Sequence, residues 1–349
     1  MKFIKVIFLL SVLFLQLVSC KDTGTGPNQK PFKDPRQMTW TADTLPVPSG
    51  AIQVLPEDLL VVSPTDIWLA TWVGHGQIMH YDGKEWKMVK EIGGGINSLV
   101  QGNSNDIWAG GYSNTIYLGH YDGVSWTRAD DKGITGEILD MTKDTEGNIW
   151  ACGRNGVVLK YDKIKWIADT IRSVSPLQQP PVLRSIQYYK DKISIIAGLT
   201  DDIGKRNFYY YITGDMKNWK LVDSMVLENS SSQIRFGNFG LYLSTDSELY
   251  SYGLEGIWRW NNSAWEKVFD LNGEVYGMCV INKDYIITGS AYKKIFFYNG
   301  GSWISLSYLF NVSDPTFVFK NFWTNGYEIF IAGYGIVNGI QKTIIWHGK

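Results

Sequence analysis

The chain has 349 residues, which length alone would divide into one large domain or two ordinary ones. It contains 36 Gly, 15 Trp, 20 Tyr and 15 Phe, while helix-favouring runs of Ala, Leu and Glu are scarce, a composition typical of all-β proteins. The 33 basic and 34 acidic residues are intermixed and leave a net charge of −1. Because no basic face is available to neutralise phosphates, nucleic acid is excluded as the expected partner.

Residues 1–19 have the pattern of a secretory signal peptide. Two lysines precede an apolar run from Val6 to Val18, which is too short and too early for a stable membrane span. The run ends in Leu17-Val18-Ser19-Cys20, which resembles the bacterial lipobox. The resemblance implies cleavage before Cys20 and attachment of a diacylglyceryl group to its thiol. Each buried methylene contributes about 0.8 kcal/mol, so two or three acyl chains would anchor the protein to a membrane.

Residues 20–37 predict a flexible tether that begins at the lipidated Cys20. They contain Gly24, Gly26 and several prolines but almost no apolar residue, so they cannot bury enough surface to fold. Lys21-Asp22 is similar to the start of the surface-export signal of Bacteroidetes lipoproteins, with a shorter acidic run. We therefore expect an exported protein, held by its lipid to the cell envelope at the outer membrane, on the periplasmic or the surface face.

Beyond the tether, two short sequence motifs, which we call the first and the second phrase, alternate along the chain at a regular spacing. The first phrase is an apolar residue, a large residue, two variable positions and a glycine, as in Ile107-Trp108-Ala109-Gly110-Gly111. It occurs seven times. The first copy, Ile67 to Thr71, lacks the final glycine, and the other six end at Gly111, Gly153, Gly198, Gly253, Gly289 and Gly333. The second phrase is Tyr-Asp-Gly, two residues and Trp, as from Tyr81 to Trp86. Variants of it end at Trp126, Trp166, Trp219, Trp265 and Trp303.

The second phrase marks a β-hairpin, because Asp, Asn and Gly tolerate the positive φ of a tight turn between apolar strands. Each unit of roughly forty residues therefore indicates four strands, and such repeats are typical of β-propellers. Ile344 to Gly348 matches the third strand of a blade, whereas Trp40 has no preceding strands. We expect Met38 to Ala42 to be the missing outer strand. The sequence thus predicts an all-β, seven-bladed β-propeller of four-stranded blades over residues 38–349, with an N-terminal strand closing the last blade.

One repeat resembles a known family. Asp144 to Gly153, followed by Gly156 to Asp162, is similar to the propeller repeat of the two-component-regulator sensor family, which implies the same fold. The Asp-Gly-x-x-Trp hairpin more distantly resembles the Asp-box of sialidase-like propellers, although it is one residue shorter between Asp and Gly. We expect no sensor-kinase activity, because no kinase segment follows the repeats.

The side chains that carry chemistry in enzymes occupy repeat positions here. We expect structural roles for three histidines and three turn aspartates: His80, His120, His347, Asp82, Asp122 and Asp162. Cys152 and Cys279 lie in distant repeats and are expected to be free, buried thiols. No metal-ligand spacing, nucleophile motif or phosphate-binding loop is present. The sequence therefore predicts a protein that is not an enzyme and that needs no cofactor or metal.

Departures from the repeat indicate a binding surface. Aromatic and arginine side chains follow the repeat glycines or lie in the longest insertion, and they are expected on one rim: Trp72, Tyr112, Arg154, Arg206, Tyr292 and Tyr334. Such side chains are enriched in recognition surfaces, although rings that merely cap blade ends would look the same in sequence. Arg184 and Arg235 lie near the starts of inner strands, where they are candidates for lining the channel.

Two functions are consistent with these features. The favoured one is a non-catalytic binding or scaffold module for an envelope protein or glycan, with the rim as contact face. The alternative is a propeller glycan hydrolase or lyase, which needs two acids about 5–10 Å apart facing the channel. The acids outside repeat positions are Glu137, Asp140, Asp202, Glu255 and Glu274. Two close, buried carboxylates in a pocket would favour the enzyme, whereas an open aromatic and arginine surface would favour binding.

Overall fold

The computed structural model describes residues 31–103, 105–129, 133–172, 179–200, 206–228 and 232–349, so the predicted signal peptide, Cys20 and Asp202 lie outside the described residues. The chain divides into two compact units, Met1–Phe32 and Lys33–Lys349, and the second unit carries the fold. Lys33–Gln37, which the sequence assigned to the tether, belong to this unit. The backbone N–H of Lys33 donates to the carbonyl of Gly326 at 2.8 Å, and the Trp40 indole donates to the carbonyl of Pro35 at 3.1 Å.

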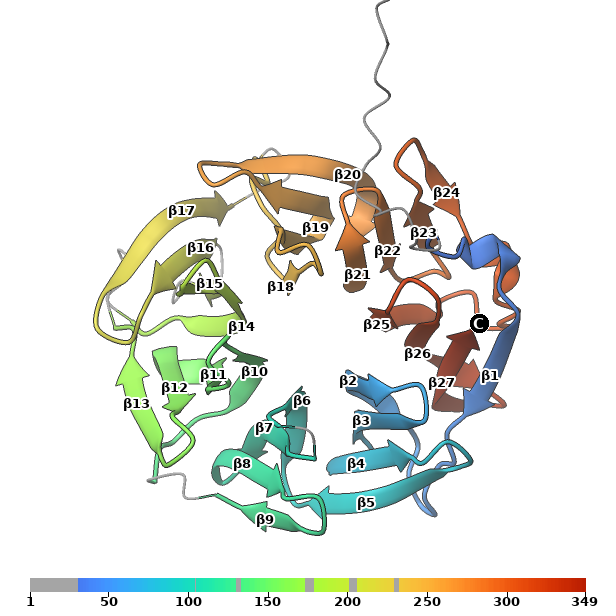
Figure 1. Ribbon diagram of the computed structural model, residues 1–349, viewed down its shortest axis with the longest axis horizontal. Helices are drawn as coiled ribbons and strands as arrows, with labels where there is room; N and C mark the ends of the chain where they lie inside the picture. Colours follow the sequence, from blue (N-terminus) through green and yellow to red (C-terminus); the bar gives the residue numbers. More distant parts are fainter. Residues whose placement is uncertain (1–30, 104, 130–132, 173–178, 201–205, 229–231) are drawn as a thin grey trace, which may run out of the picture. The chain divides into compact units, whose positions relative to one another are not determined.

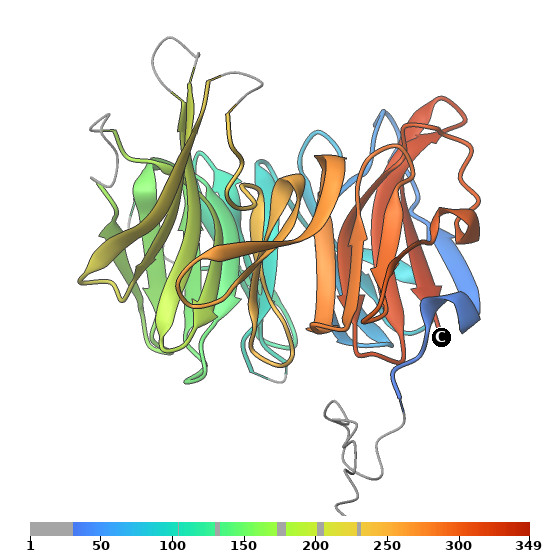
Figure 2. The same ribbon diagram turned by 90° about the horizontal axis from the view of Figure 1, so that it is seen from above.

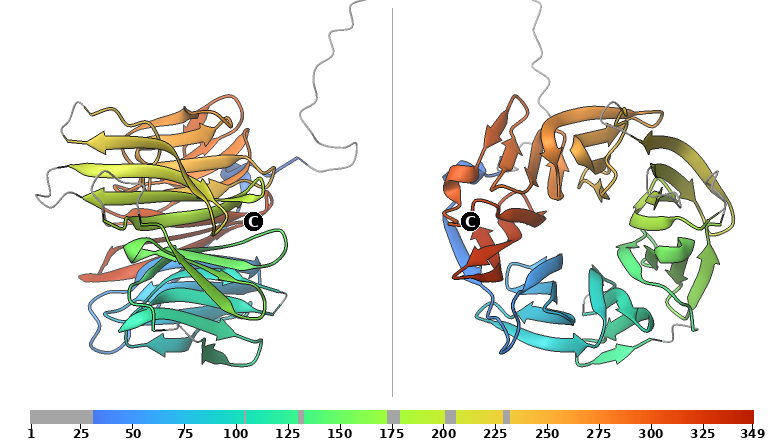
Figure 3. Two further views of the ribbon diagram at one scale, coloured as in Figure 1. Left: turned by 90° about the vertical axis from the view of Figure 1, so that its left-hand side faces the viewer. Right: turned by 180° about the vertical axis from the view of Figure 1, so that it is seen from behind.

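The described strands of Lys33–Lys349 form seven antiparallel sheets around a central channel (Figure 1). Consecutive strands are neighbours within each sheet, with the first strand at the channel and the last on the outside. Seen from the side, the sheets stand around the ring axis like blades (Figures 2 and 3). The unit is a seven-bladed β-propeller, which confirms the fold predicted from the sequence. Among the described residues, none forms a helix with the length and apolarity needed to cross a membrane.

The first four blades each contain four strands, which follow one another from the channel outward. Blade 1 has β2 (Leu55–Ser63), β3 (Asp66–Trp72), β4 (Gly76–Tyr81) and β5 (Trp86–Ile92). Blade 2 has β6 (Gly95–Gln101), β7 (Ile107–Ser113), β8 (Thr115–Tyr121) and β9 (Trp126–Arg128). Blade 3 has β10 (Ile138–Lys143), β11 (Ile149–Gly153), β12 (Val157–Tyr161) and β13 (Trp166–Thr170), with the 3-10 helix η2 (Arg154–Gly156) between β11 and β12. Blade 4 has β14 (Val182–Tyr189), β15 (Lys192–Thr200), β16 (Asn207–Gly214) and β17 (Trp219–Leu227).

The remaining blades depart from this plan in two places. Blade 5 has β18 (Gly240–Leu243), β19 (Leu249–Trp260) and β20 (Trp265–Glu274). Here β19 fills the second and third positions, because its first half pairs with β18 and its second half with β20. Blade 6 has β21 (Gly277–Asn282), β22 (Tyr285–Gly289), β23 (Ile295–Tyr298) and β24 (Trp303–Ser305), followed by η3 (Ser307–Leu309). Blade 7 has β25 (Val318–Thr324), β26 (Ile329–Val337), β27 (Ile340–Gly348) and β1 (Trp40–Thr44), which follows η1 (Pro35–Gln37).

The N-terminal strand closes the ring as predicted. β1 pairs antiparallel with β27, from Trp40 opposite Gly348 to Thr44 opposite Ile344. The strand therefore starts at Trp40 rather than at Met38. Its pairing satisfies the outer edge of β27, which would otherwise leave a row of unmet backbone donors and acceptors.

The hairpin aspartates have the turn role expected of them. Oδ1 of Asp122 accepts backbone N–H groups from Val124 and Ser125, both at 2.8 Å, and Asp82 and Asp162 accept equivalent pairs. The turn is completed by Gly123, whose φ of 94° is unfavourable for other residues. These hydrogen bonds also hold the pKa of Asp122 below its usual range. The repeated Asp is therefore a structural residue of the hairpin.

Tryptophan and histidine side chains fill the space between blades. Trp108 in blade 2 packs edge-on against Trp166 in blade 3, with ring centroids 5.3 Å apart. His120 stacks on Trp108 at 4.2 Å and is hydrogen-bonded to Asp106. The same arrangement recurs twice: His80 stacks on Trp68 and is hydrogen-bonded to Asp66, and His347 stacks on Phe330 and is hydrogen-bonded to Glu328. The predicted structural role of these histidines is confirmed, as is the prediction that Cys152 and Cys279 are free and buried.

Candidate functional site: the channel recess

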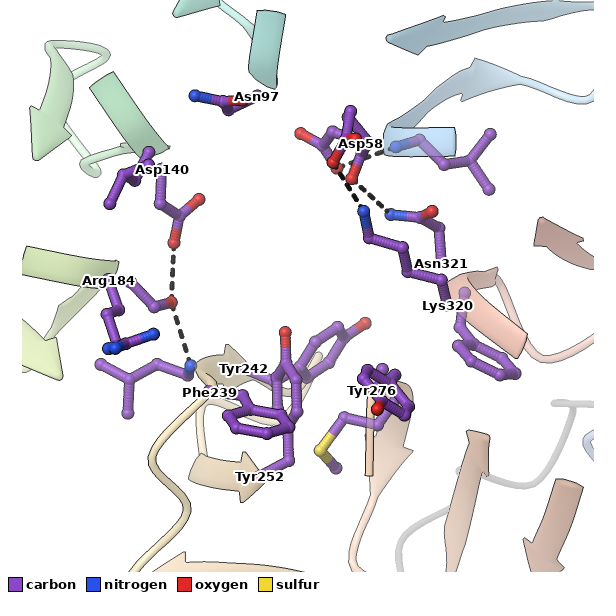
Figure 4. Close-up of a pocket in the computed structure, with 18 of the residues that line it drawn as sticks. Asp58, Asn97, Asp140, Arg184, Phe239, Tyr242, Tyr252, Tyr276, Lys320 and Asn321 are labelled. Atoms are coloured by element: carbon purple, nitrogen blue, oxygen red, sulfur yellow. Dashed lines mark hydrogen bonds and ion pairs between the residues drawn. The ribbon is translucent and has the colours of Figure 1, made fainter. Parts of the chain in front are cut away.

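The first residues of the seven inner strands enclose a recess of about 360 Å³ in the channel (Figure 4). Every blade contributes to its wall, through β2, β6, β10, β14, β18, β21 and β25 or the residues just before them. A cavity of this size is at the lower end of the range for small-ligand pockets. We call this cavity the channel recess.

Five inner strands carry a β-bulge near their start, and the extra residue of each bulge lines the recess: Glu57, Asn97, Leu139, Arg184 and Lys320. A bulge places one additional residue on a strand and redirects its side chain. Arg184 was expected from the sequence to line the channel, and it does. Arg235 does not line the recess; it lies in a separate pocket with Trp258 and Trp265, where it pairs with Asp223 at 2.9 Å.

The residue after the bulge ties each of the first four blades to the next. In blades 1 to 4 this residue is Asp or Ser, and its side chain accepts a backbone N–H from the inner strand of the following blade. The four pairs are Asp58 with Leu99 (2.7 Å), Ser98 with Met141 (3.1 Å), Asp140 with Ile186 (2.9 Å) and Ser185 with Leu241 (3.0 Å). We call this series the belt. It was not predicted from the sequence.

The belt brings two carboxyl groups close together. The Ser98 hydroxyl lies between them, 3.3 Å from Oδ2 of Asp58 and 3.5 Å from Oδ1 of Asp140. Asp140 accepts further hydrogen bonds from the Met141 N–H at 2.8 Å and the Ser185 hydroxyl at 2.7 Å. Both carboxylates are thus held by backbone and hydroxyl donors of the protein.

Burial dominates the electrostatics of this pair. It raises the pKa of Asp140 to about 7, and the nearby Asp58 charge acts in the same direction. Burial likewise raises the pKa of Asp58. The hydrogen bonds from Ser185 and Ile186 oppose the shift at Asp140, because they favour the charged carboxylate.

The belt stops in blades 5 and 6, where aromatic side chains replace it. Gly240 and Met278 occupy the corresponding positions and have no polar side chain to offer. Four rings gather on this side of the recess: Phe239, Tyr242, Tyr252 and Tyr276 (Figure 4). We call these four residues the aromatic arc. Polar contacts between inner strands reappear from blade 7 to blade 1, in a different form from the belt. Asn321 Nδ2 donates to the Glu57 carbonyl at 3.1 Å, and Lys320 pairs with the Glu57 carboxylate at 2.6 Å.

The predicted rim residues do not line the recess but surround its mouth. Trp72, Tyr112 and Tyr334 pair in the sheets with Leu55, Gly95 and Val318, which begin the inner strands. The rim and the recess are therefore at the same end of the channel. Burial raises the pKa of Tyr276, as do its hydrogen bond to Glu274 and, to a smaller extent, the nearby phenols of Tyr334 and Tyr292.

The rim side chains differ in exposure and pairing. Tyr292 is 68% exposed. Arg154 is exposed but pairs with Glu137 at 2.6 Å, and Arg206 is exposed and lies 3.8 Å from a Glu228 oxygen. Trp72, Tyr112 and Tyr334 are half-buried. The rim is thus a mixed surface, with aromatic side chains on blades 1, 2, 6 and 7 and paired arginines on blades 3 and 4.

Of the acids proposed for catalysis, Asp140 alone lines the recess among those that the structure describes. Glu137 accepts from Asn97 at 2.9 Å and pairs with Arg154, Glu274 accepts from Tyr276, and Glu255 pairs with Lys267 at 3.3 Å. Asp58, which was not singled out from the sequence, shares the Ser98 hydroxyl with Asp140. Over the described ranges, no three His, Cys, Asp or Glu side chains gather in a way that could hold a metal ion.

Comparison with solved structures defines the chain as a β-propeller protein. It is similar to a structure titled "YCF48 bound to D1 peptide", with a TM-score of 0.60 and 15% identity over 88% of this chain and 94% of that one. It is similar to YCF48 from Cyanidioschyzon merolae (TM-score 0.57, 13% identity, 88% and 98% covered). A third similar structure is the WD40 β-propeller domain of Doa1 (TM-score 0.54, 10% identity, 85% and 97% covered).

These likenesses show the fold alone, because the identities are low. No protein-family model and no curated protein matches the chain. Function must therefore be argued from the recess and the rim.

Proposed function

We propose that the chain is a cell-envelope lipoprotein whose β-propeller is a non-catalytic binding module for a protein or a glycan. The observation that carries this proposal is the construction of the channel recess. Its close carboxylates are engaged in ties between blades, while the aromatic arc and the rim offer side chains suited to recognition.

The alternative, a glycan hydrolase or lyase, draws on the same two carboxylates. Asp58 and Asp140 are close and partly buried, which is the arrangement such an enzyme needs. A general acid or base must also direct a free oxygen or proton toward the substrate. Both oxygens of Asp140 already accept short hydrogen bonds from the protein, and Ser98 and Ser185 perform the same tie in the neighbouring blades. A structural role explains all four positions, so binding is the better supported function.

The contact face we propose is the rim of Trp72, Tyr112, Arg154, Arg206, Tyr292 and Tyr334. It surrounds the mouth of the recess and includes exposed aromatic and arginine side chains. The similar propeller in the structure titled "YCF48 bound to D1 peptide" holds a peptide, which supports a protein partner here. From the likeness of Asp144 to Gly153 to the propeller repeat of the two-component-regulator family, we further propose that the blades are of that type.

The rim is tested by capture of an envelope partner in a pull-down. We expect the triple variant Trp72→Ala, Tyr112→Ala, Tyr334→Ala to lose the partner that the wild type captures. Because these three side chains are half-buried, the exposed pair Arg206→Ala, Tyr292→Ala serves as a second rim variant. A matched control is Val124→Ala, Ile164→Ala, which changes two exposed apolar residues on the hairpins at the opposite ends of the strands. Undiminished capture by both rim variants would remove this face as the functional site.

The location is tested at Cys20. We propose that its lipidation, followed by the tether, holds the propeller at the outer membrane. The variant Cys20→Ser should convert a protein that sediments with membranes into one that remains in the supernatant. Unchanged sedimentation would contradict the lipid anchor, and protease treatment of intact cells would distinguish the surface face from the periplasmic face.

A further inference from the structure

The charges around the channel recess are not balanced. Glu57 is neutralised by Lys320 at 2.6 Å. Asp58 and Asp140, in contrast, accept hydrogen bonds only from backbone N–H groups and serine hydroxyls, and among the described residues no Lys, Arg or His forms an ion pair with either. Arg184 lines the same recess, yet it lies over the ring of Tyr209 at 5.8 Å. Neither carboxyl group therefore has a direct ion-pair partner in the described part of the chain. Burial raises the pKa of Asp58, and the charge of Lys320 opposes this shift without forming an ion pair with it.

The aromatic arc faces these carboxylates. Figure 4 shows Tyr242, Tyr252 and Phe239 on the side of the recess opposite Asp58 and Asn97. After burial, the charges of Asp140 and Asp58 are the causes that raise the pKa of Tyr252, so its phenol lies within their electrostatic reach. A cation in the recess would thus have carboxyl groups on one side and aromatic rings on the other, and proteins use both kinds of group to recognise ammonium and guanidinium ions.

We propose that the channel recess receives the lysine or arginine side chain of a peptide segment from a protein partner that docks on the rim. This inference rests on the proposed binding function and specifies the chemistry of the ligand. A peptide is favoured because the recess opens at the end of the channel where the rim lies, so a docked chain can insert one side chain. A neutral sugar gains no ion-pair attraction from the two carboxyl groups, whose oxygens already accept hydrogen bonds from the protein, and an acidic group is repelled by them. A metal ion lacks a third ligand among the described residues.

The belt itself supplies the variants that test this inference. Ser98 and Ser185 accept the cross-blade N–H without a charge, so Asp58→Ser with Asp140→Ser removes both charges while keeping a side-chain oxygen at each tie. The matched control is Asp122→Asn, which removes one charge at a hairpin turn that Asn261 and Asn299 form in the same way. Thermal melting checks that each variant is folded. If the serine variant fails to fold, Tyr276→Leu tests the aromatic arc instead.

The experiment measures binding of the full chain in detergent to capped pentapeptides Gly-Gly-X-Gly-Gly by calorimetry or NMR titration. With X as Lys or Arg, we expect saturable binding at least about tenfold tighter than with X as Glu or Leu, or than binding of maltopentaose. The double serine variant should bind the Lys peptide at least about tenfold more weakly, with the salt dependence of binding reduced. Asp122→Asn should leave the affinity unchanged.

Three results would overturn the inference: equal affinity for the Lys and Leu peptides, preference for the Glu peptide or the oligosaccharide, or unchanged binding by both the serine variant and Tyr276→Leu. Its failure is distinguishable from failure of the proposed function. A partner lost by the rim variants but retained by the double serine variant would leave the docking face standing and remove the recess as the site of insertion.

Discussion

Blades 1 to 4 and blades 5 and 6 join their neighbours in different ways. In the first group, Asp58, Ser98, Asp140 and Ser185 each bind a backbone N–H of the next inner strand. In the second group, the corresponding Gly240 and Met278 cannot do so, and β18 and β21 begin without a bulge. Instead, the Phe239 ring of blade 5 lies against Tyr276 at the start of blade 6, with ring centroids 5.8 Å apart. The channel is therefore tied by short polar side chains on one side and by rings on the other.

This difference connects stability with function. Where the belt is complete, the inner strands are held at fixed spacing and their polar groups are occupied by the protein. Where it is absent, the large side chains of the aromatic arc line the recess. Loss of the repeat position in two blades thus creates the wall that is available to a ligand. The comparison predicts that removing a hydrogen bond of the belt acts on stability, whereas substitutions in the aromatic arc act mainly on binding.

The largest difference in stability is expected between two equivalent glycines. A Cβ on Gly153 would overlap the backbone carbonyl of Glu137, just before the inner strand of blade 3, whereas a Cβ on Gly289 would meet side-chain atoms of Phe319 and Phe322 rather than backbone. We expect Gly153→Ala to cost roughly 3–5 kcal/mol and Gly289→Ala about 1–2 kcal/mol. Denaturant unfolding of both variants measures this, and equal costs would contradict the difference between the two regions.

The next largest effect concerns the belt. Asp140→Ala leaves the N–H of Ile186 and the hydroxyl of Ser185 without their acceptor in the channel wall, at an expected cost of about 2–3 kcal/mol. Asp140→Ser should cost less than about 1 kcal/mol, because serine performs the tie in blades 2 and 4. If the two variants unfold at the same denaturant concentration, the hydrogen bonds of the belt do not carry the stability assigned to them.

The pH dependence of stability follows from the same carboxylate. The pKa of Asp140 is raised from 3.8 to about 7 in the folded protein, so the folded state holds the proton more tightly than the unfolded chain does. Its contribution to stability is complete below about pH 4 and is lost as the pH rises through about 7. Asp58 acts in the same direction. We expect the wild-type melting temperature to fall more between about pH 5 and about pH 8 than that of Asp140→Ser. Parallel profiles would show that this group does not titrate in that range.

The smallest effect is expected at the hairpins, which are alike in both regions. Asp122 in blade 2 and Asn261 in blade 5 accept the same pair of backbone N–H groups. Asp122→Asn should therefore change the free energy of unfolding by less than about 0.5 kcal/mol. A loss above about 1 kcal/mol, measured by the same denaturant titration, would indicate that the charge has a role beyond the turn.

Features that depend on neighbouring residues in the chain were predictable from the sequence. The hairpins were marked by Asp82, Asp122 and Asp162, and the closing strand by a lone Trp40 facing an unfinished last repeat. Blade 5 was harder, since a single strand, β19, serves two positions there. Arg235 was wrongly expected to line the channel. A position near the start of an inner strand does not fix where a side chain points when that strand has no bulge.

The belt was missed because its members alternate between Asp and Ser and are separated by 40 to 45 residues. No local pattern joins them, and their partners are backbone groups of another blade. A signal was nevertheless present: Asp58-Leu59, Ser98-Leu99, Asp140-Met141 and Ser185-Ile186 are each a small polar residue before an apolar one at the start of an inner strand. Aligning the repeats on that dipeptide would have located the recess.

The closing strand has a consequence for the order in which the molecule is completed. Thr41 and His347, which meet at the junction of β1 and β27, are 306 residues apart in the chain. During synthesis, which delivers N-terminal residues first, β1 waits unpaired until nearly the whole ring has been made. Contacts between residues so far apart in the sequence form late and make folding slower. Release of β27 is thus the event that converts a row of adjacent blades into a closed ring. Truncation of that strand alone would leave β1 without a partner and β26 paired only with β25.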